Sequence, residues 1–335
     1  MKTQNYRRGT ASASLITTAL AVPLMPSAPV SGQIYQANAA QISGAHYSEP
    51  LTGYSNGIVD DSGIDEALEF IAPRTPAGRK FEYKTEEAKA DFQYDAEDAR
   101  EIGEDFKTMQ IVKEMVLGKT LNRGLTAVID EDDHDDSENP EEEAVERIIR
   151  RLKRNELIRA IALLDAAAVN TGRVWSTAAG KNPEADLRAS LMAGADASGR
   201  LATNLLFSEL AWNTRVSSHE AQNTAGGFAA ADRSVDEVAT KIRATRGLIN
   251  SSRYDNDGVL TNILGSAVYS YTALPGATRK DSSNIKRFVT TIGGQQFRVH
   301  RIQISAKVVH VTVEHYSQTY ITSTLGIRKE TVSDA

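Results

Sequence analysis

The chain has 335 residues, of which 41% are hydrophobic and 24% charged, a balance typical of one large globular domain or two ordinary ones. It contains no cysteine, which excludes disulfides, thiolate metal sites and a catalytic thiol. The formal net charge of -6 argues against a protein that coats nucleic acid by bulk attraction.

Residues 1–63 are low in charge and rich in Ala, Ser, Gly and Pro, so they predict an arm without a core of its own. Pro23, Pro26 and Pro29 recur every three residues, which favours extended backbone. Residues 1–31 also have the outline of a secretory signal, and both interpretations stay open. The apolar stretch is too short and too polar to span a bilayer as a stable helix.

A short helix is predicted over residues 64–70, before a stretch broken by proline and glycine. Phe81 and Tyr83, and later Phe92 and Tyr94, then alternate with polar residues at period two. This alternation predicts two strands. The charged stretch between the two aromatic pairs is predicted as the tip of a hairpin.

A long helix is predicted after the acid run, residues 131–143. Asn139 is a good N-cap, Pro140 fits the first helical position, and Glu142 falls at the third, an arrangement typical of a capping box. Acidic residues in the first turn also complement the helix dipole. Gly172 is the predicted stop.

The apolar residues of this helix change face near its middle, by roughly 150° at about 100° per residue. One face carries Val145, Ile148, Ile149 and Leu152, and the other carries Leu157, Ile158, Ile161, Leu164 and Ala168. A helix of ~30 residues is ~45 Å long. We therefore predict a long helix whose two halves pack against different neighbouring elements.

Alternating helices and strands are predicted over residues 182–274. Asn182 caps a helix that begins at Pro183, Ser208 caps another, and Ser234 forms a capping box with Glu237. A strand is expected over 201–207 and further strands over 259–274.

The C-terminal part is strand-rich. Gly293 and Gly294 predict a hairpin turn between strands over 290–292 and 296–304. Valines at alternating positions continue the strand pattern from 308. Helices and strands together indicate an α+β fold.

The acid run is a candidate calcium-binding loop. Its oxygen donors at plausible spacing are Asp130, Asp132, Asp136, Glu138 and Glu141. However, an EF-hand loop needs glycine at its sixth position, where this chain has Asp135. We interpret the run as a solvated turn and helix start.

No catalytic or cofactor motif is present in the sequence. The six histidines lack the spacing of a metal site, and neither a nucleophile elbow nor a phosphate-binding glycine loop occurs. The sequence therefore predicts no enzyme, no cofactor and no metal.

A basic cluster lies on the long helix: Arg147, Arg150, Arg151, Lys153, Arg154 and Arg159. It is a candidate for contact with nucleic acid. Charge pairing is the favoured interpretation, either with Glu146 and Glu156 of the same helix or with the acid run of a neighbouring copy.

The order of these parts resembles a tailed-bacteriophage major capsid protein with the Hong Kong 97-like shell fold. The closest local likeness is carried by Trp175, Asn182-Pro183, Ser208, Ala211-Trp212 and His219, and by the stretch 124–130. The resemblance covers most of the chain.

The resemblance implies a division of the chain into five parts. These are an N-terminal arm (1–63), an extended β loop with the start of a peripheral domain (64–135), a spine helix region (136–181), an axial α/β domain (182–286) and C-terminal strands that complete the peripheral domain (287–335). The extended β excursion itself is expected over 78–129.

The resemblance also implies a function. The chain would assemble with itself into pentamers and hexamers of an icosahedral virion shell around double-stranded DNA, formed in the host cytoplasm. Scaffold, portal and decoration proteins would be partners, DNA would be held only non-specifically, and no membrane would be involved. The alternatives are an encapsulin-like nanocompartment shell and an exported bacterial protein with a signal peptide at 1–31.

Subunit-contact residues follow as hypotheses. Aromatic anchors on a neighbour would be Phe81, Tyr83, Phe92 and Tyr94, and basic contacts would come from Arg74, Arg79, Lys80, Arg147, Arg150, Arg151 and Arg154. Because an arm gains order only on neighbours, deletion of residues 1–60 is expected to abolish closed particles and leave a soluble fold.

Overall fold

The computed structural model describes residues 46–59, 62–85, 99–100, 102–103, 105–106, 115–133, 139–175 and 181–334. All of them belong to one compact unit. The signal-peptide alternative at 1–31, most of the predicted arm, Phe92 and Tyr94 lie outside the described residues. None of the helices that the structure describes is long and apolar enough to cross a membrane.

The first sheet contains strands from both ends of the described chain. Its order is β1-β11-β13-β12, and β4 pairs with the other edge of β13. The strands are β1 (Arg74–Pro76), β4 (Leu121–Asp130), β11 (Ile285–Thr290), β12 (Phe297–Gln303) and β13 (Val308–Ile321). β13 is therefore the central strand, since it pairs along its length with three others.

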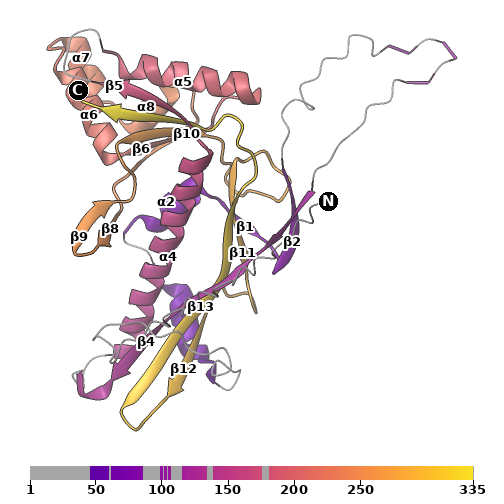
Figure 1. Ribbon diagram of the computed structural model, residues 1–335, viewed down its shortest axis with the longest axis vertical. Coiled ribbons are helices and arrows are strands. Elements are labelled where there is room, and N and C mark those ends of the chain that lie inside the picture. Colours follow the sequence, from indigo (N-terminus) through magenta and orange to yellow (C-terminus); the bar gives the residue numbers. More distant parts are fainter. Residues whose placement is uncertain are drawn as a thin grey trace, which may run out of the picture. The chain divides into compact units, whose positions relative to one another are not determined.

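The second sheet has the order β5-β14-β10-β6-β7. Its strands are β5 (Val169–Val174), β14 (Arg328–Ser333), β10 (Ala267–Tyr271), β6 (Asn204–Ser208) and β7 (Arg246–Asn250). Four helices gather around it (Figure 1): α5 (Pro183–Ser198), α6 (Glu209–Glu220), α7 (Ala225–Ala231) and α8 (Val235–Ile242). Trp175 and Phe207 lie in the core between helices and sheet.

Helix α4 (Pro140–Ala167) runs from the first sheet to the second (Figure 1). Its first half packs Ile149 and Leu152 into a core with Val311 of β13. Its second half packs Leu157 and Leu164 into a different core, which includes α2 (Ile64–Ile71) and strands of the second sheet. The predicted change of apolar face is confirmed, because each half buries a different side of the helix.

The predicted start of α4, with Asn139 at the N-cap and Pro140 at the first helical position, is confirmed, but the capping box and the predicted stop are wrong. Asn139 occupies the N-cap position, but its side chain makes no capping hydrogen bond, so there is no capping box. The helix ends at Ala167, and Gly172 lies inside β5. Ala168 adopts an extended backbone because β5 begins at once and pairs in parallel with β14.

The other predicted helix starts are confirmed. The Asn182 side chain accepts a hydrogen bond from the backbone N–H of Ala185, and Ser208 does the same for Ala211. Ser234 and Glu237 form both bonds of a capping box. These signals succeed because both partners lie within one turn of chain.

Part of the predicted arm is a helix that packs on the rest of the chain. In α1 (Glu49–Gly57), Leu51 joins the core around β13. The Thr52 hydroxyl accepts a 3.0 Å hydrogen bond from the N–H of Val299, and the Asn56 amide donates to the carbonyl of Phe297. The segment thus covers the open edge of β12 with polar side chains, which hydrophobic patterning does not reveal.

The double glycine forms the predicted tight turn, across which Ile292 and Gln295 exchange two backbone hydrogen bonds, but the strands on either side do not pair with each other. β11 and β12 both pair with β13, with Thr290 opposite Tyr316 and Phe297 opposite His315, so they form one interrupted strand. Gly293 and Gly294 form the turn of the short loop between β11 and β12, with φ of 62° and 81°. The true hairpin turn joins β12 to β13 over residues 304–307, since Ile304 N–H donates to the Val308 carbonyl.

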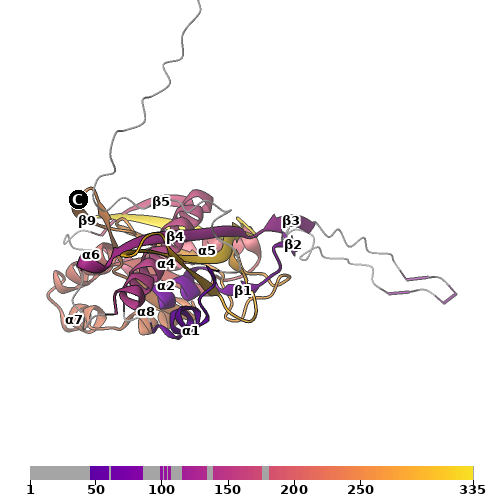
Figure 2. The same ribbon diagram turned by 90° about the horizontal axis from the view of Figure 1, so that it is seen from below.

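Two small ribbons stand beside the sheets (Figures 1 and 2). β2 (Lys80–Lys84) pairs with β3 (Met115–Lys119), and β8 (Arg253–Asn256) pairs with β9 (Val259–Asn262). In the described chain β2 pairs with β3, about thirty residues later. The hairpin tip predicted between Tyr83 and Phe92 lies outside the described residues.

Candidate subunit-contact surfaces

Phe81 and Tyr83 belong to an aromatic cluster inside the chain. Each is 5% exposed. The Phe81 ring lies 4.3 Å from that of Phe288, and the Tyr83 ring lies 5.2 Å from that of Tyr320, measured between centroids. The cluster fixes the base of the β2–β3 ribbon to the first sheet. Contact of these two rings with a neighbour stays a prediction, and their burial gives it no support.

The three basic residues beside this ribbon are exposed. The Arg79 guanidinium lies 4.6 Å from the centre of the Tyr316 ring, and the Arg74 backbone N–H donates to Glu69. Lys80 points from an exposed position of β2. Arg74, Arg79 and Lys80 are thus accessible to a neighbour, and their contact with one stays a prediction.

Charge pairing accounts for half of the basic cluster on α4. Arg147 pairs with Glu143 and Arg150 with Glu146, each at 2.5 Å and one turn apart. Lys153 pairs with Asp65 in the first turn of α2 at 2.6 Å. Pairs as exposed as the first two contribute only about 0.3–0.5 kcal/mol each. Across the described chain, Arg151 and Arg154 make no ion pair, so both remain candidates for intersubunit contact.

Several carboxylates in and next to the acid run are paired within the chain. Asp130 accepts a hydrogen bond from the N–H of Asp132, whose own carboxylate pairs with Lys307 at 2.5 Å. Glu141 pairs with Arg301 at 2.7 Å. Asp136 and Glu138 of the hypothetical calcium loop lie outside the described residues. Within the described ranges no group of three or more His, Asp or Glu is placed to hold a metal.

A buried ion-pair network joins three helices around the second sheet. Arg215 of α6 is fully buried and donates to Glu184 of α5 at 2.6 Å and to the Ala230 carbonyl of α7 at 2.7 Å. His219, one turn after Arg215, lies 2.5 Å from the other oxygen of Glu184. Burial opposes the charge of Glu184, but Arg215 outweighs it and lowers the pKa of that carboxyl. Sequence reasoning missed this network, whose only local signal was the spacing of Arg215 and His219.

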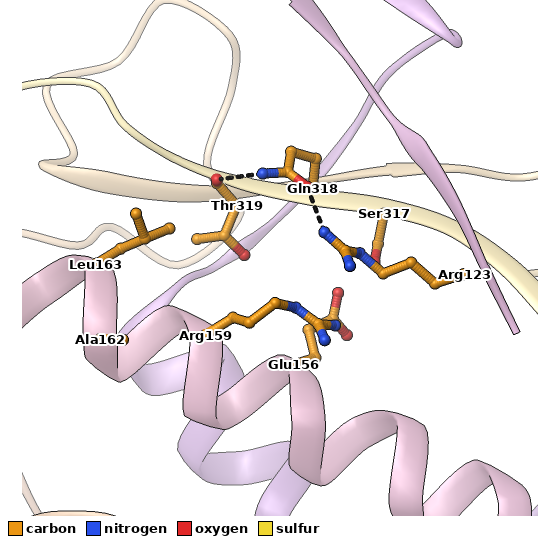
Figure 3. Close-up of a pocket in the computed structure, with 8 residues that line it drawn as sticks. All are labelled: Arg123, Glu156, Arg159, Ala162, Leu163, Ser317, Gln318 and Thr319. Atoms are coloured by element: carbon orange, nitrogen blue, oxygen red, sulfur yellow. Dashed lines mark hydrogen bonds between the residues drawn. The ribbon is translucent and has the colours of Figure 1, made fainter. Parts of the chain in front are cut away.

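A charged pocket of about 310 Å³ lies between α4 and the first sheet (Figure 3). It is lined by Arg123 of β4, by Glu156, Arg159, Ala162 and Leu163 of α4, and by Ser317, Gln318 and Thr319 of β13. It forms where the apolar face of α4 turns away from the sheet. The sheet-facing positions beyond that point carry Glu156 and Arg159 in place of aliphatic residues.

The pocket holds more positive than negative charge. Glu156 is 3% exposed and accepts a 3.2 Å bond from Arg287, which also bonds Glu69 at 3.0 Å. Arg123 donates to the neutral amide oxygen of Gln318 at 2.8 Å. One terminal nitrogen of Arg159 is buried and has no hydrogen-bond partner among the described residues. Burial, and then the charge of Arg123, lower the pKa of Arg159, against the opposing effect of Glu156.

His315 lies behind this pocket and is neutral at pH 7. Burial lowers its pKa to about 4, against an opposing effect of Glu156, while the nearby arginines lower it further. Its Nε2 and the Ser317 hydroxyl form a 3.0 Å hydrogen bond. It therefore adds no positive charge to the pocket near neutral pH.

Comparison with known proteins identifies the fold. No family model and no curated protein matches the chain. Among solved structures, a phage-related protein from Bordetella bronchiseptica RB50 is 15% identical, with 86% of this chain and 97% of that chain covered at a TM-score of 0.63.

Two capsids show the same architecture. The capsid of a native GTA particle matches with 13% identity, 83% of this chain and 92% of that chain, at a TM-score of 0.53. The capsid of the cyanophage P-SCSP1u matches with 5% identity, 80% and 88% coverage, at a TM-score of 0.50. The chain therefore has the α+β fold of phage capsid proteins, as its resemblance to the Hong Kong 97-like shell fold predicted.

Proposed function

We propose that this protein is the major shell protein of a phage-like capsid, a structural protein that assembles with copies of itself. The observation that carries the proposal is the fold, since 86% of the chain matches a phage-related protein at a TM-score of 0.63 and the capsid of a GTA particle shares it. Because the low identity limits the likeness to the fold, the exposed surfaces described next add support of their own.

The two small ribbons support self-association. A two-stranded ribbon is marginal on its own and gains stability by resting on another surface. Leu117 of β3 is 79% exposed and Leu260 of β9 is 73% exposed, although both are large apolar residues. Burial of such side chains against a neighbouring copy would stabilise contacts by roughly 25 cal/mol per Å² of apolar surface.

The finer proposal is that the copies form pentamers and hexamers of an icosahedral shell that encloses double-stranded DNA in a virion. Contacts between two different surfaces of each copy close into rings, which is the geometry such capsomers need. The net charge of -6 suits a wall that holds a polyanion only loosely. Scaffold, portal and decoration proteins are the partners that this function would require.

Sedimentation and negative-stain microscopy of the purified full chain test the proposal. We expect rings of five or six copies or closed shells, and nuclease-protected DNA in particles taken from a producing cell. A folded chain that stays monomeric at high concentration would contradict the shell function. Shells that hold protein in place of DNA would instead indicate a nanocompartment.

A further inference from the structure

The charged pocket between α4 and the first sheet holds two arginines, Arg123 and Arg159, and one carboxylate, that of Glu156 (Figure 3). Among the described residues, Arg123 donates to the neutral Gln318, and the buried terminal nitrogen of Arg159 has no hydrogen-bond partner. The buried Oε1 of Glu156 also lacks a partner. Because unpaired buried polar groups are costly, the site would gain from a further hydrogen-bonding group.

Glu156 does not neutralise the two arginines. Its Oε2 accepts from Arg287, and Arg287 also serves Glu69, so these three residues carry one positive and two negative charges. Arg123 and Arg159 add two positive charges, and His315 is neutral near pH 7. The cluster as a whole keeps one uncompensated positive charge in a half-buried site.

The lining of the pocket favours an acidic side chain over a nucleic-acid backbone. Two guanidinium forks converge on one concavity, and this geometry binds a carboxylate through paired hydrogen bonds. Ala162 and Leu163 offer apolar surface for the methylene groups of such a side chain. DNA is instead bound by rows of exposed cations that follow its phosphates, whereas Arg123 and Arg159 are both half-buried.

The acid run of the same chain is too far away to fill the pocket. Arg123 lies near the start of β4 and Asp130 at its end, seven residues later. At about 3.4 Å per residue, their Cα atoms are ~24 Å apart. An arginine and an aspartate together reach about half that distance. Carboxylates at the far end of β4 can therefore enter this pocket only from another copy.

We propose that the pocket binds an acidic side chain of an adjacent copy of the chain, and so forms a heterologous contact of the assembled shell. The inference rests on the proposed function, since it needs the copies to associate. The contact joins two different surfaces of each copy, which allows a ring to close. Candidate donors are the exposed Glu131 and Asp133, just beyond the far end of β4.

Neutral substitutions in the pocket provide the main test. We expect Arg159→Gln and Arg123→Gln each to raise the protein concentration needed for assembly at least about 10-fold, because each leaves a buried charge pair incomplete. Arg188→Gln is the matched control: Arg188 is an exposed helical arginine of α5 without an ion pair among the described residues. Circular dichroism and thermal melting of each soluble variant check that the fold is intact.

Charge reversal locates the donor. Arg159→Glu should block assembly, and lysines in place of Glu131 and Asp133 should restore it if these residues are the donors. Assembly of the folded Arg159→Gln variant at the wild-type concentration would overturn the proposal. The proposal would also be overturned if the pocket variants assembled normally but retained less DNA than the wild type, because the pocket would then bind phosphate.

A wild-type chain that does not assemble would refute the proposed function. Binding of a carboxylate by the pocket would then be measured separately. Hexaglutamate should then bind the soluble subunit in a calorimetric titration, and Arg159→Gln should weaken that binding at least about 10-fold. No binding of hexaglutamate to the wild-type subunit would refute the carboxylate assignment itself.

Discussion

Two groups of buried charged side chains connect different elements of this subunit. Arg215, Glu184 and His219 connect helices around the second sheet, and Glu156 and Arg287 connect α4 to β11. Such groups are tolerated in low dielectric only because an opposite charge or a hydrogen bond accompanies each one. They also make the stability of the subunit depend on pH.

We expect the free energy of unfolding to fall as the pH is lowered from about 6.5 to about 4, through His315. Burial lowers the pKa of this residue to about 4 in the folded chain, whereas a free imidazole has a pKa of ~6.5. Between these values the unfolded chain binds a proton that the folded chain does not. Acid therefore favours unfolding, by up to ~1.4 kcal/mol per pH unit.

Urea unfolding at pH 7, 6 and 5 measures this effect. His315→Gln should flatten the dependence, although His219, whose pKa burial also lowers, keeps part of it. His310→Gln is the control, since His310 is half-exposed on the same strand. Equal slopes for wild type and His315→Gln would show that His315 does not titrate in this window.

At the scale of elements, local chemistry predicts helix starts well and strand pairing poorly. Asn182, Ser208 and Ser234 each cap a helix as expected, because a cap and its partner are three residues apart. The double glycine at 293–294 is a true turn, but its strands pair with β13 and not with each other. Register depends on a distant partner strand, which period-two alternation does not identify.

The close pairing of β4 with β13 gives a test at this scale. A Cβ added at Gly124 would lie 2.7 Å from the Val313 carbonyl oxygen, a backbone atom. We expect Gly124→Ala to destabilise the subunit by about 1–3 kcal/mol, because the central ladder must shift. Gly172→Ala in β5 is the control, since its added Cβ meets nothing within 4 Å. Equal midpoints in urea for the two variants would contradict the close approach.

At the scale of the whole molecule, the folded part of the chain begins well before residue 63, where composition predicted the end of the arm. Helix α1 lies in the segment that composition assigned to the arm, and it covers the edge of β12. A cut at 60 would remove Leu51 from the core and expose that edge. A cut at 45 leaves these contacts in place.

Two truncations test this boundary and the shell function together. Deletion of residues 1–45 should leave the melting temperature unchanged and abolish closed particles, because contacts with neighbours are lost. Deletion of residues 1–60 should lower the melting temperature by several degrees or cause aggregation. Normal particles from the shorter deletion would show that residues 1–45 are dispensable for assembly, and equal melting of both would show that α1 adds no stability.

The sequence alone determined the α+β class, the long helix with two apolar faces, the helix caps of the α/β region and the resemblance to a capsid fold. Each depends on residues within a few turns of one another. The tertiary structure decided the role of α1, the partner of β2, the interrupted strand of β11 and β12, and the charged pocket. Arg123 and Arg159 meet there through the pairing of β4 with β13 and the packing of α4 on both. Contacts between segments so distant in sequence leave no local pattern, because the free energy that selects them is gained only when the chain has folded.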